Sequence, residues 1–210
     1  MDIIARILRN ESPPEAPEER CDYCARPIGE AHPHLVDLTD RRLMCACRPC
    51  YLVFAPSGAA KGRYKVVPER YVHLKDLTLS DATWDQLQIP IGLAFFFYNS
   101  AESKMMAFYP GPAGAMESLL SLDMWNNVLA LEPQLSGMEP DVEALLVRRQ
   151  RENPQEYFIV PIDACYQLIG LIRLSWKGFD GGEEARERID GFFADLRTRS
   201  DGAPTGVTRT

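Results

Sequence analysis

The chain has 210 residues, of which 46% are hydrophobic and 25% are charged. These values are typical of a folded globular protein with one domain and an annex or two small domains, and they exclude collagen-like, wholly disordered and coiled-coil chains. The net charge of −7 makes non-specific nucleic-acid binding unfavourable, because such binding needs clustered cations.

The charge is divided unevenly along the chain. Residues 21–76 hold nine Lys/Arg against six Asp/Glu, whereas residues 77–210 hold eleven against nineteen. This asymmetry indicates two modules with different surfaces. We expect an N-terminal segment and Pro/Glu-rich linker over residues 1–20, a cysteine module over 21–76, a second domain over 77–199 and a disordered tail over 200–210.

The apolar runs of the chain are too short to predict a membrane span. The longest covers residues 89–98 and is interrupted by Pro90 and Gly92, whereas a transmembrane helix needs about 20 apolar residues. The first residues also lack the apolar core and small-residue cleavage site of a secretory signal. We therefore expect a cytoplasmic protein, whose cysteines stay reduced.

The predicted elements define an α+β protein: a small zinc-ribbon-like β-hairpin module, followed by an α+β domain with an antiparallel sheet. In the module, strands are expected over 34–38 and 42–45, and an extended stretch over 63–74. The second domain is expected to begin with a helix over 81–87, capped by Ser80, and an apolar hairpin over 93–98 and 104–109. A loop over 110–114, a helix over 121–131, strands over 142–148 and 157–160, and helices over 163–173 and 183–199 complete the prediction. Because both faces of the hairpin are apolar, we expect helices on at least one of them and protein or a partner on the other.

Five of the six cysteines lie within residues 21–50. Cys21 and Cys24 form one CxxC pair, and Cys47 and Cys50 form another. Two thiolates separated by two residues in a tight turn can reach one ion at about 2.3 Å, so two such pairs can complete a tetrahedron. In a chain with reduced cysteines this spacing predicts a four-cysteine zinc site with a structural role.

The sequence leaves the ligand set partly open. Cys45 precedes Cys47 by two residues and could take its place as a ligand, since alternate residues of a strand point the same way. We favour Cys47, because the spacing from Cys45 to Cys50 does not form a CxxC pair, and a free cysteine is usually a small buried hydrophobe. His32 or His34 could also replace one cysteine.

Iron is the alternative metal. Rubredoxin-type sites also use two CxxC turns, but they carry glycine after the second cysteine of each pair, where this chain has Ala25 and Tyr51. The substitutions favour zinc over an iron-based electron carrier. A thioredoxin-like dithiol is less favoured still, since no βαβ pattern surrounds either pair.

The sequence does not predict an enzyme. There is no GxSxG motif and no histidine after His73, so a Ser-His-Asp triad would have to borrow its histidine from the cysteine module. Cys165 stands alone, and we expect it to serve in packing. A nucleic-acid-binding zinc ribbon is compatible with the positive charge of residues 21–76, but the acidic remainder and the few aromatic residues among those cations argue against it.

Several motifs resemble those of a known family. They are the CxxC pair at 21–24, the CxCxxC run at 45–50, and the segments PIGLAFFF (90–97), YPGPAGAMES (109–118), EPDVEALLV (139–147) and PIDACY (161–166). Together they resemble an uncharacterised bacterial family, often encoded beside the uptake-type NiFe hydrogenases of actinobacteria, over about residues 20–197. The family pattern usually has serine and threonine where this chain has Gly111 and Met116. The resemblance implies an accessory or adaptor protein that binds a hydrogenase subunit or maturation factor, and it implies no catalytic residues.

Overall fold

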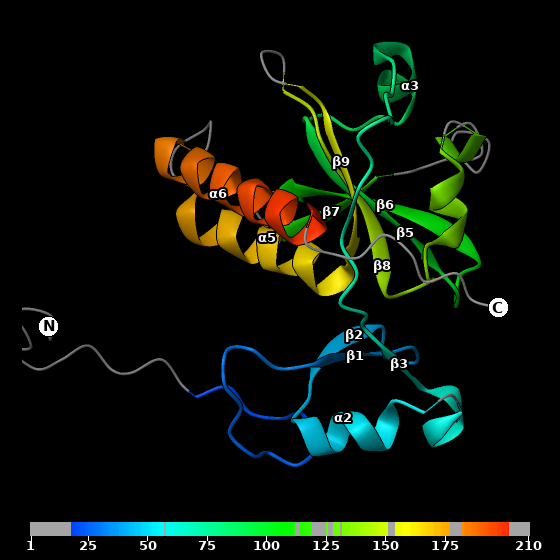
Figure 1. Cartoon of the computed structure of the whole chain (residues 1–210), viewed down its shortest axis with the longest axis vertical. Coiled ribbons are helices and arrows are strands. Elements are labelled where there is room, and N and C mark those ends of the chain that lie inside the picture. Colours follow the sequence, from blue (N-terminus) through cyan, green and yellow to red (C-terminus); the bar gives the residue numbers. More distant parts are fainter. Residues whose placement is uncertain are drawn as a thin grey trace, which may run out of the picture.

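The structure is a computed structural model, and it describes residues 18–56, 58–111, 114–118, 125, 128–130, 132–150, 154–176 and 182–201. The N-terminal module contains an antiparallel sheet in the order β2-β1-β3, made of β1 (His34–Asp37), β2 (Arg42–Cys45) and β3 (Tyr64–Val66). Helix α2 (Arg48–Phe54) follows β2, and the 3-10 turn η1 (Ala59–Gly62) precedes β3. Figure 1 shows this module at one end of the molecule.

The larger body is built on a six-stranded antiparallel sheet in the order β4-β9-β8-β5-β6-β7. Its strands are β4 (Val72–His73), β5 (Leu93–Asn99), β6 (Lys104–Gly111), β7 (Gly114–Ser118), β8 (Glu143–Arg148) and β9 (Glu156–Pro161). The predicted α+β class, with antiparallel sheets and an N-terminal hairpin module, is confirmed.

Helices cover both faces of the six-stranded sheet, as the apolar strands require. On one face, Phe95, Leu146 and Phe158 pack against α5 (Ile162–Ser175) and α6 (Gly182–Asp201), which lie side by side (Figure 1). On the other face, Phe96 and its neighbours pack against α3 (Asp81–Gln86), the helical residues 125 and 128–130, and the 3-10 helix η2 (Pro133–Gly137). Consecutive residues of a strand point to opposite faces, so the apolar run 93–98 contributes to both cores.

Local signals account for several helix ends. The hydroxyl of Ser80 accepts a hydrogen bond from the amide of Thr83 and caps α3, as predicted. Helix α5 begins earlier than expected: the sequence predicts Asp163 as its N-cap, but Pro161 occupies that position and Asp163 lies in the first turn. A carboxylate there interacts favourably with the positive end of the helix dipole.

Two segments differ from the prediction. Residues 48–54, for which the sequence predicts no helix, form helix α2. The loop expected over 110–114 is the end of a hairpin, because β6 continues to Gly111 and pairs with β7 from Gly114 onward. Parts of the predicted helix over 121–131, residues 1–17 of the N-terminal segment and most of the C-terminal tail lie outside the described residues.

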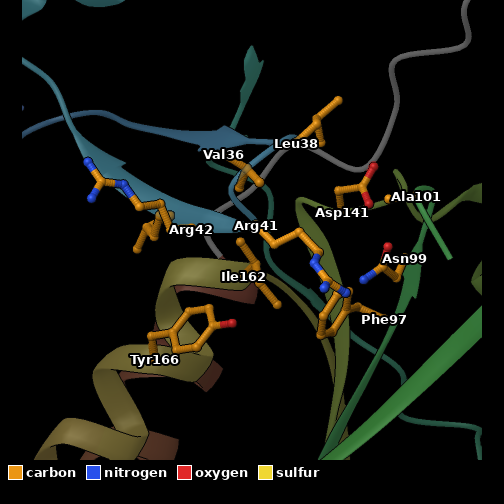
Figure 2. Close-up of a pocket in the computed structure, with 11 residues that line it drawn as sticks. Val36, Leu38, Arg41, Arg42, Phe97, Asn99, Ala101, Asp141, Ile162 and Tyr166 are labelled. Atoms are coloured by element: carbon orange, nitrogen blue, oxygen red, sulfur yellow. The ribbon is translucent and has the colours of Figure 1, made fainter. Parts of the chain in front are cut away.

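The module and the body share an apolar contact. Val36 on β1 and Val67 after β3 join the same buried cluster as Ile162 and Leu168 of α5. A cavity of about 60 Å³ remains at this contact. Figure 2 shows Val36 of the module and, across the cavity, Ile162 and Tyr166 of α5 and Phe97 of β5.

Charged side chains reinforce the same contact. Arg41 of the module pairs with Glu102 of the body. The Lys65 ammonium donates a hydrogen bond to the carbonyl of Pro140 at 2.6 Å and lies 3.6 Å from Glu139. The unequal charge of the two chain segments is therefore used in part to hold the module on the body. Such exposed pairs each contribute only about 0–1 kcal/mol, so the buried valines carry more of this contact.

Candidate metal centre

The first cysteine pair lies on a tight turn. The amide of Ala25 donates a hydrogen bond to the carbonyl of Cys21 at 2.8 Å, and the amide of Cys21 donates to the carbonyl of Arg26 at 2.9 Å. Ala25 has a φ of 57°, which is the left-handed conformation that glycine adopts most easily. Ala25 therefore occupies the position where rubredoxin-type turns carry glycine, and the turn closes in spite of the side chain.

The second pair lies at the start of a helix instead of on a second turn of the same kind. Cys47 is the N-cap of α2, and Cys50 lies in its first turn. Pro49 favours this helix start, because its fixed φ suits the helix and an N–H group at this position would have no acceptor within the helix. The amide of Tyr51 donates to the carbonyl of Cys47 at 2.9 Å, so this pair is held by helical hydrogen bonding.

The fold brings the two pairs together. The sulfur atoms of Cys21, Cys24, Cys47 and Cys50 all lie within 4.8 Å of one another, and the sulfurs of Cys24 and Cys47 are 3.6 Å apart. A tetrahedral ion with metal–sulfur bonds of about 2.3 Å separates its sulfur ligands by about 3.8 Å. The four cysteines chosen from spacing are therefore placed to hold one metal ion.

Burial and hydrogen bonding shift the pKa values of two of the four thiols in opposite directions. Burial alone would raise the pKa of the Cys21 thiol. Hydrogen bonds from the backbone of Cys47, Tyr23 and Cys24 outweigh this effect and lower the pKa to about 6. Burial and hydrogen bonds with the other three thiols raise the pKa of Cys50 to about 12. A divalent cation bound at the centre would hold all four sulfurs as thiolates, whatever the pKa of each thiol without the ion.

The module has a small apolar core of its own beside this site. Leu35, Met44 and Ala46 are buried there, and several partly buried aromatic side chains pack around them. A core of this size cannot stabilise a module of about 50 residues without further support. This is the situation in which a bound metal supplies folding free energy.

The other candidate residues of the module lie elsewhere. Cys45 and the two histidines, His32 and His34, do not join the four sulfurs; their ligand atoms form a second group, within 4.8 Å of one another. Cys45 ends β2, and Met44 beside it points into the module core. Strand alternation therefore directs Cys45 away from that core. The sequence prediction treated these three residues as substitutes for a cysteine and missed that they form a group of their own.

Cys165 lies outside both groups. It is fully buried in α5, in the core between the sheet and the helices. Burial raises the pKa of its thiol well above the ordinary value, so its environment is that of a packing residue, as predicted, and not of a reactive thiolate.

The fold and the cysteine cluster define the class of this protein: an α+β protein whose N-terminal module carries four cysteines placed close enough together to hold one metal ion. Comparison with known families places it more closely, since residues 20–200 match the family of unknown function DUF5947, and the chain belongs to this family. No curated protein and no solved structure shows a significant match. Among the described residues, no helix is both long and apolar enough to cross a bilayer.

Proposed function

We propose that the four cysteines bind zinc and that the zinc has a structural role. The observation that carries this proposal is the gathering of the four sulfurs within 4.8 Å of one another, on a turn and a helix start that the module needs for its fold. A redox-inert cation suits this role, because it holds both elements in place without changing its ligands. The residues after each pair, Ala25 and Tyr51, favour zinc over iron.

We further propose that the protein is a non-catalytic accessory protein that binds a NiFe hydrogenase subunit or maturation factor. The partner is suggested by the family resemblance. The surface that we assign to partner binding is the outer face of α2, where Leu52 and Val53 are 55% and 64% exposed. Because α2 starts within the cysteine site, binding of zinc at that site would organise this surface.

The metal assignment is tested by elemental analysis of the protein isolated from its native host without reconstitution. We expect at least one zinc per chain and a colourless protein. Iron in place of zinc, with the visible absorption of an iron–thiolate site, would contradict the zinc proposal and favour the electron carrier.

The accessory role is tested by affinity isolation of the tagged full chain from the same host. We expect hydrogenase subunits or maturation factors with the wild-type chain, and at least a tenfold lower yield with the Leu52→Ser/Val53→Ser double variant. A Leu174→Ser variant is the matched control, because Leu174 is an exposed apolar residue of another helix, α5. Isolation of neither class of partner under gentle conditions would refute the accessory role.

A further inference from the structure

Strand pairing in the module assembles a second group of metal-ligating side chains. In the β1–β2 hairpin His34 lies directly opposite Cys45, and His32 precedes β1 by two residues. The rings of His32 and His34 lie with their centroids 4.6 Å apart. Each of the three residues offers one ligand atom, and these atoms lie within 4.8 Å of one another.

His32 carries an unsatisfied nitrogen into this group. Its Nδ1 donates a hydrogen bond to the carbonyl of Gly29 at 2.8 Å, which leaves Nε2 as the nitrogen with the free lone pair. The side chain of His32 is only 6% exposed, and its Nε2 is buried without a hydrogen-bond partner among the described residues. A buried polar atom without a partner is costly, and a bound cation would remove that cost.

His34 is oriented in the same way by a residue of the body. Its Nδ1 donates to a carboxylate oxygen of Asp163 at 2.9 Å. The other oxygen of Asp163 accepts the amide of Ala164 at 2.8 Å, so the carboxylate is fixed at the start of α5. Histidines that bind metals usually donate their second ring nitrogen to a carboxylate or a backbone carbonyl, and His34 and His32 have one of each.

We propose that His32 Nε2, His34 Nε2 and Cys45 Sγ form a second metal site, distinct from the four cysteines, that binds a divalent transition metal ion of the zinc type. Imidazole and thiolate ligands suit this class of ion over magnesium or calcium. The backbone near the third ligand is fixed, since the amide of Cys45 donates to the Asp22 carboxylate at 2.6 Å. Zinc bound to three protein ligands keeps a fourth position for water or a small ligand.

The surroundings leave room for that fourth ligand. The three residues line an open hollow of about 790 Å³ between the module and the body. Residues of both charges line the same hollow, among them Arg48, Arg199 and Glu69. Water or another small ligand could therefore reach an ion held by these three residues, unlike an ion enclosed by four sulfurs.

The test counts metal ions on the full-length protein. The chain is saturated with Zn²⁺, freed of unbound ions and analysed for metal per chain. We expect two ions for the wild type and one for the His32→Ala/His34→Ala double variant. The His73→Ala variant is the matched control with two ions, because His73 is the remaining histidine of the chain and lies on β4, stacked on Phe158.

Cobalt substitution then shows which site is lost. Four thiolates give stronger sulfur-to-cobalt charge-transfer absorption than one, so the tetrathiolate signal should be the same in the double variant as in the wild type. This equality also shows that the variant module is folded. An Asp163→Asn variant, which keeps all three ligands, should weaken binding of the second ion about 10–100-fold.

The possible outcomes separate this inference from the zinc assignment of the four cysteines. Equal metal content in the wild type and the double variant would overturn the second site, as would an Asp163→Asn variant with unchanged affinity for the second ion. If the cobalt-substituted wild type shows no tetrathiolate absorption but still binds one ion through His32 and His34, the proposed structural site would be overturned and the second site supported.

Discussion

The Cys24→Ser substitution offers the sharpest test of a structural metal. Cys24 is exposed, so serine in its place opens no cavity in the core and chiefly removes a metal ligand. Burial of Leu35 and Met44, the two large side chains buried in the module core, contributes about 1.5–3 kcal/mol each. Structural zinc contributes about 10–16 kcal/mol in small zinc-dependent folds at neutral pH. The contribution of the metal to the folding free energy is larger than that of these two apolar side chains. The module should therefore unfold when the metal is lost, while the body remains folded.

Hydrogen exchange read by mass spectrometry on the full chain measures this difference. In Cys24→Ser we expect amides of β1, β2 and α2 to lose protection by at least 100-fold, while β5, β8 and β9 exchange as in the wild type. The same pattern should follow chelation of the wild type and reverse when zinc is restored. His73→Ala is the control, because it leaves both the four cysteines and the group of His32, His34 and Cys45 intact, and β1 and α2 should stay protected. Unchanged protection of β1 and α2 in Cys24→Ser, with metal loss verified, would refute the structural role.

Three further predictions concern one contact between the module and the body, one contact within the module and one within the body. Val36→Ala should lower the free energy of unfolding by about 1–3 kcal/mol, measured by denaturant titration, because it enlarges the cavity beside Ile162. Asp37→Asn should lower the stability of the module at pH 7 by about 1–3 kcal/mol, because the hydrogen bonds from Arg63 hold the pKa of Asp37 below its ordinary value. Because that pKa is lowered on folding, the contribution is complete above about pH 4 and is lost as the pH falls further. Gly92→Ala should lower the free energy of unfolding by more than Val36→Ala or Asp37→Asn does, since a β-carbon at residue 92 would lie 1.9 Å from the carbonyl oxygen of Arg149.

Each of these predictions has a result that would contradict it. A Val36→Ala protein as stable as the wild type would mean that the module contact contributes little to the fold. A stability difference for Asp37→Asn that stays constant from pH 7 to pH 3 would show that the ion pair with Arg63 is not its source. An unaffected Gly92→Ala protein would show that strands β5 and β8 can separate locally at little cost.

The features predicted correctly from the sequence depend on residues that lie close together along the chain. The cap at Ser80 and the hairpin of β1 and β2 are local signals, and so is the CxxC spacing that selected the four cysteines. Helix α2 was missed because it has seven residues, too few for a visible period, and it carries Pro49 within the CxxC pair. Strand β7 was missed because Pro110 and Gly111 are typical of loops, although they pair with Ala115 and Gly114.

The second group of ligands was missed for a different reason. The expected hairpin already placed His34 near Cys45, and a His-x-His pattern facing a cysteine was a usable signal. Asp163 could not have been found in this way, because it lies 129 residues from His34 along the chain. Contacts of that range depend on how the module docks on the body, which no local pattern encodes.

The short strand β4 constrains how this protein can be dissected. Val72 and His73 pair with Ile159 and Phe158 of β9, although they lie on the basic side of the change in charge near residue 76. A shortened chain starting at residue 77 would leave one side of β9 without hydrogen-bond partners. Exposed edge strands of this kind promote self-association. Recombinant versions of the body should therefore begin ahead of Tyr71, or insolubility caused by truncation will be mistaken for a dependence on the missing module.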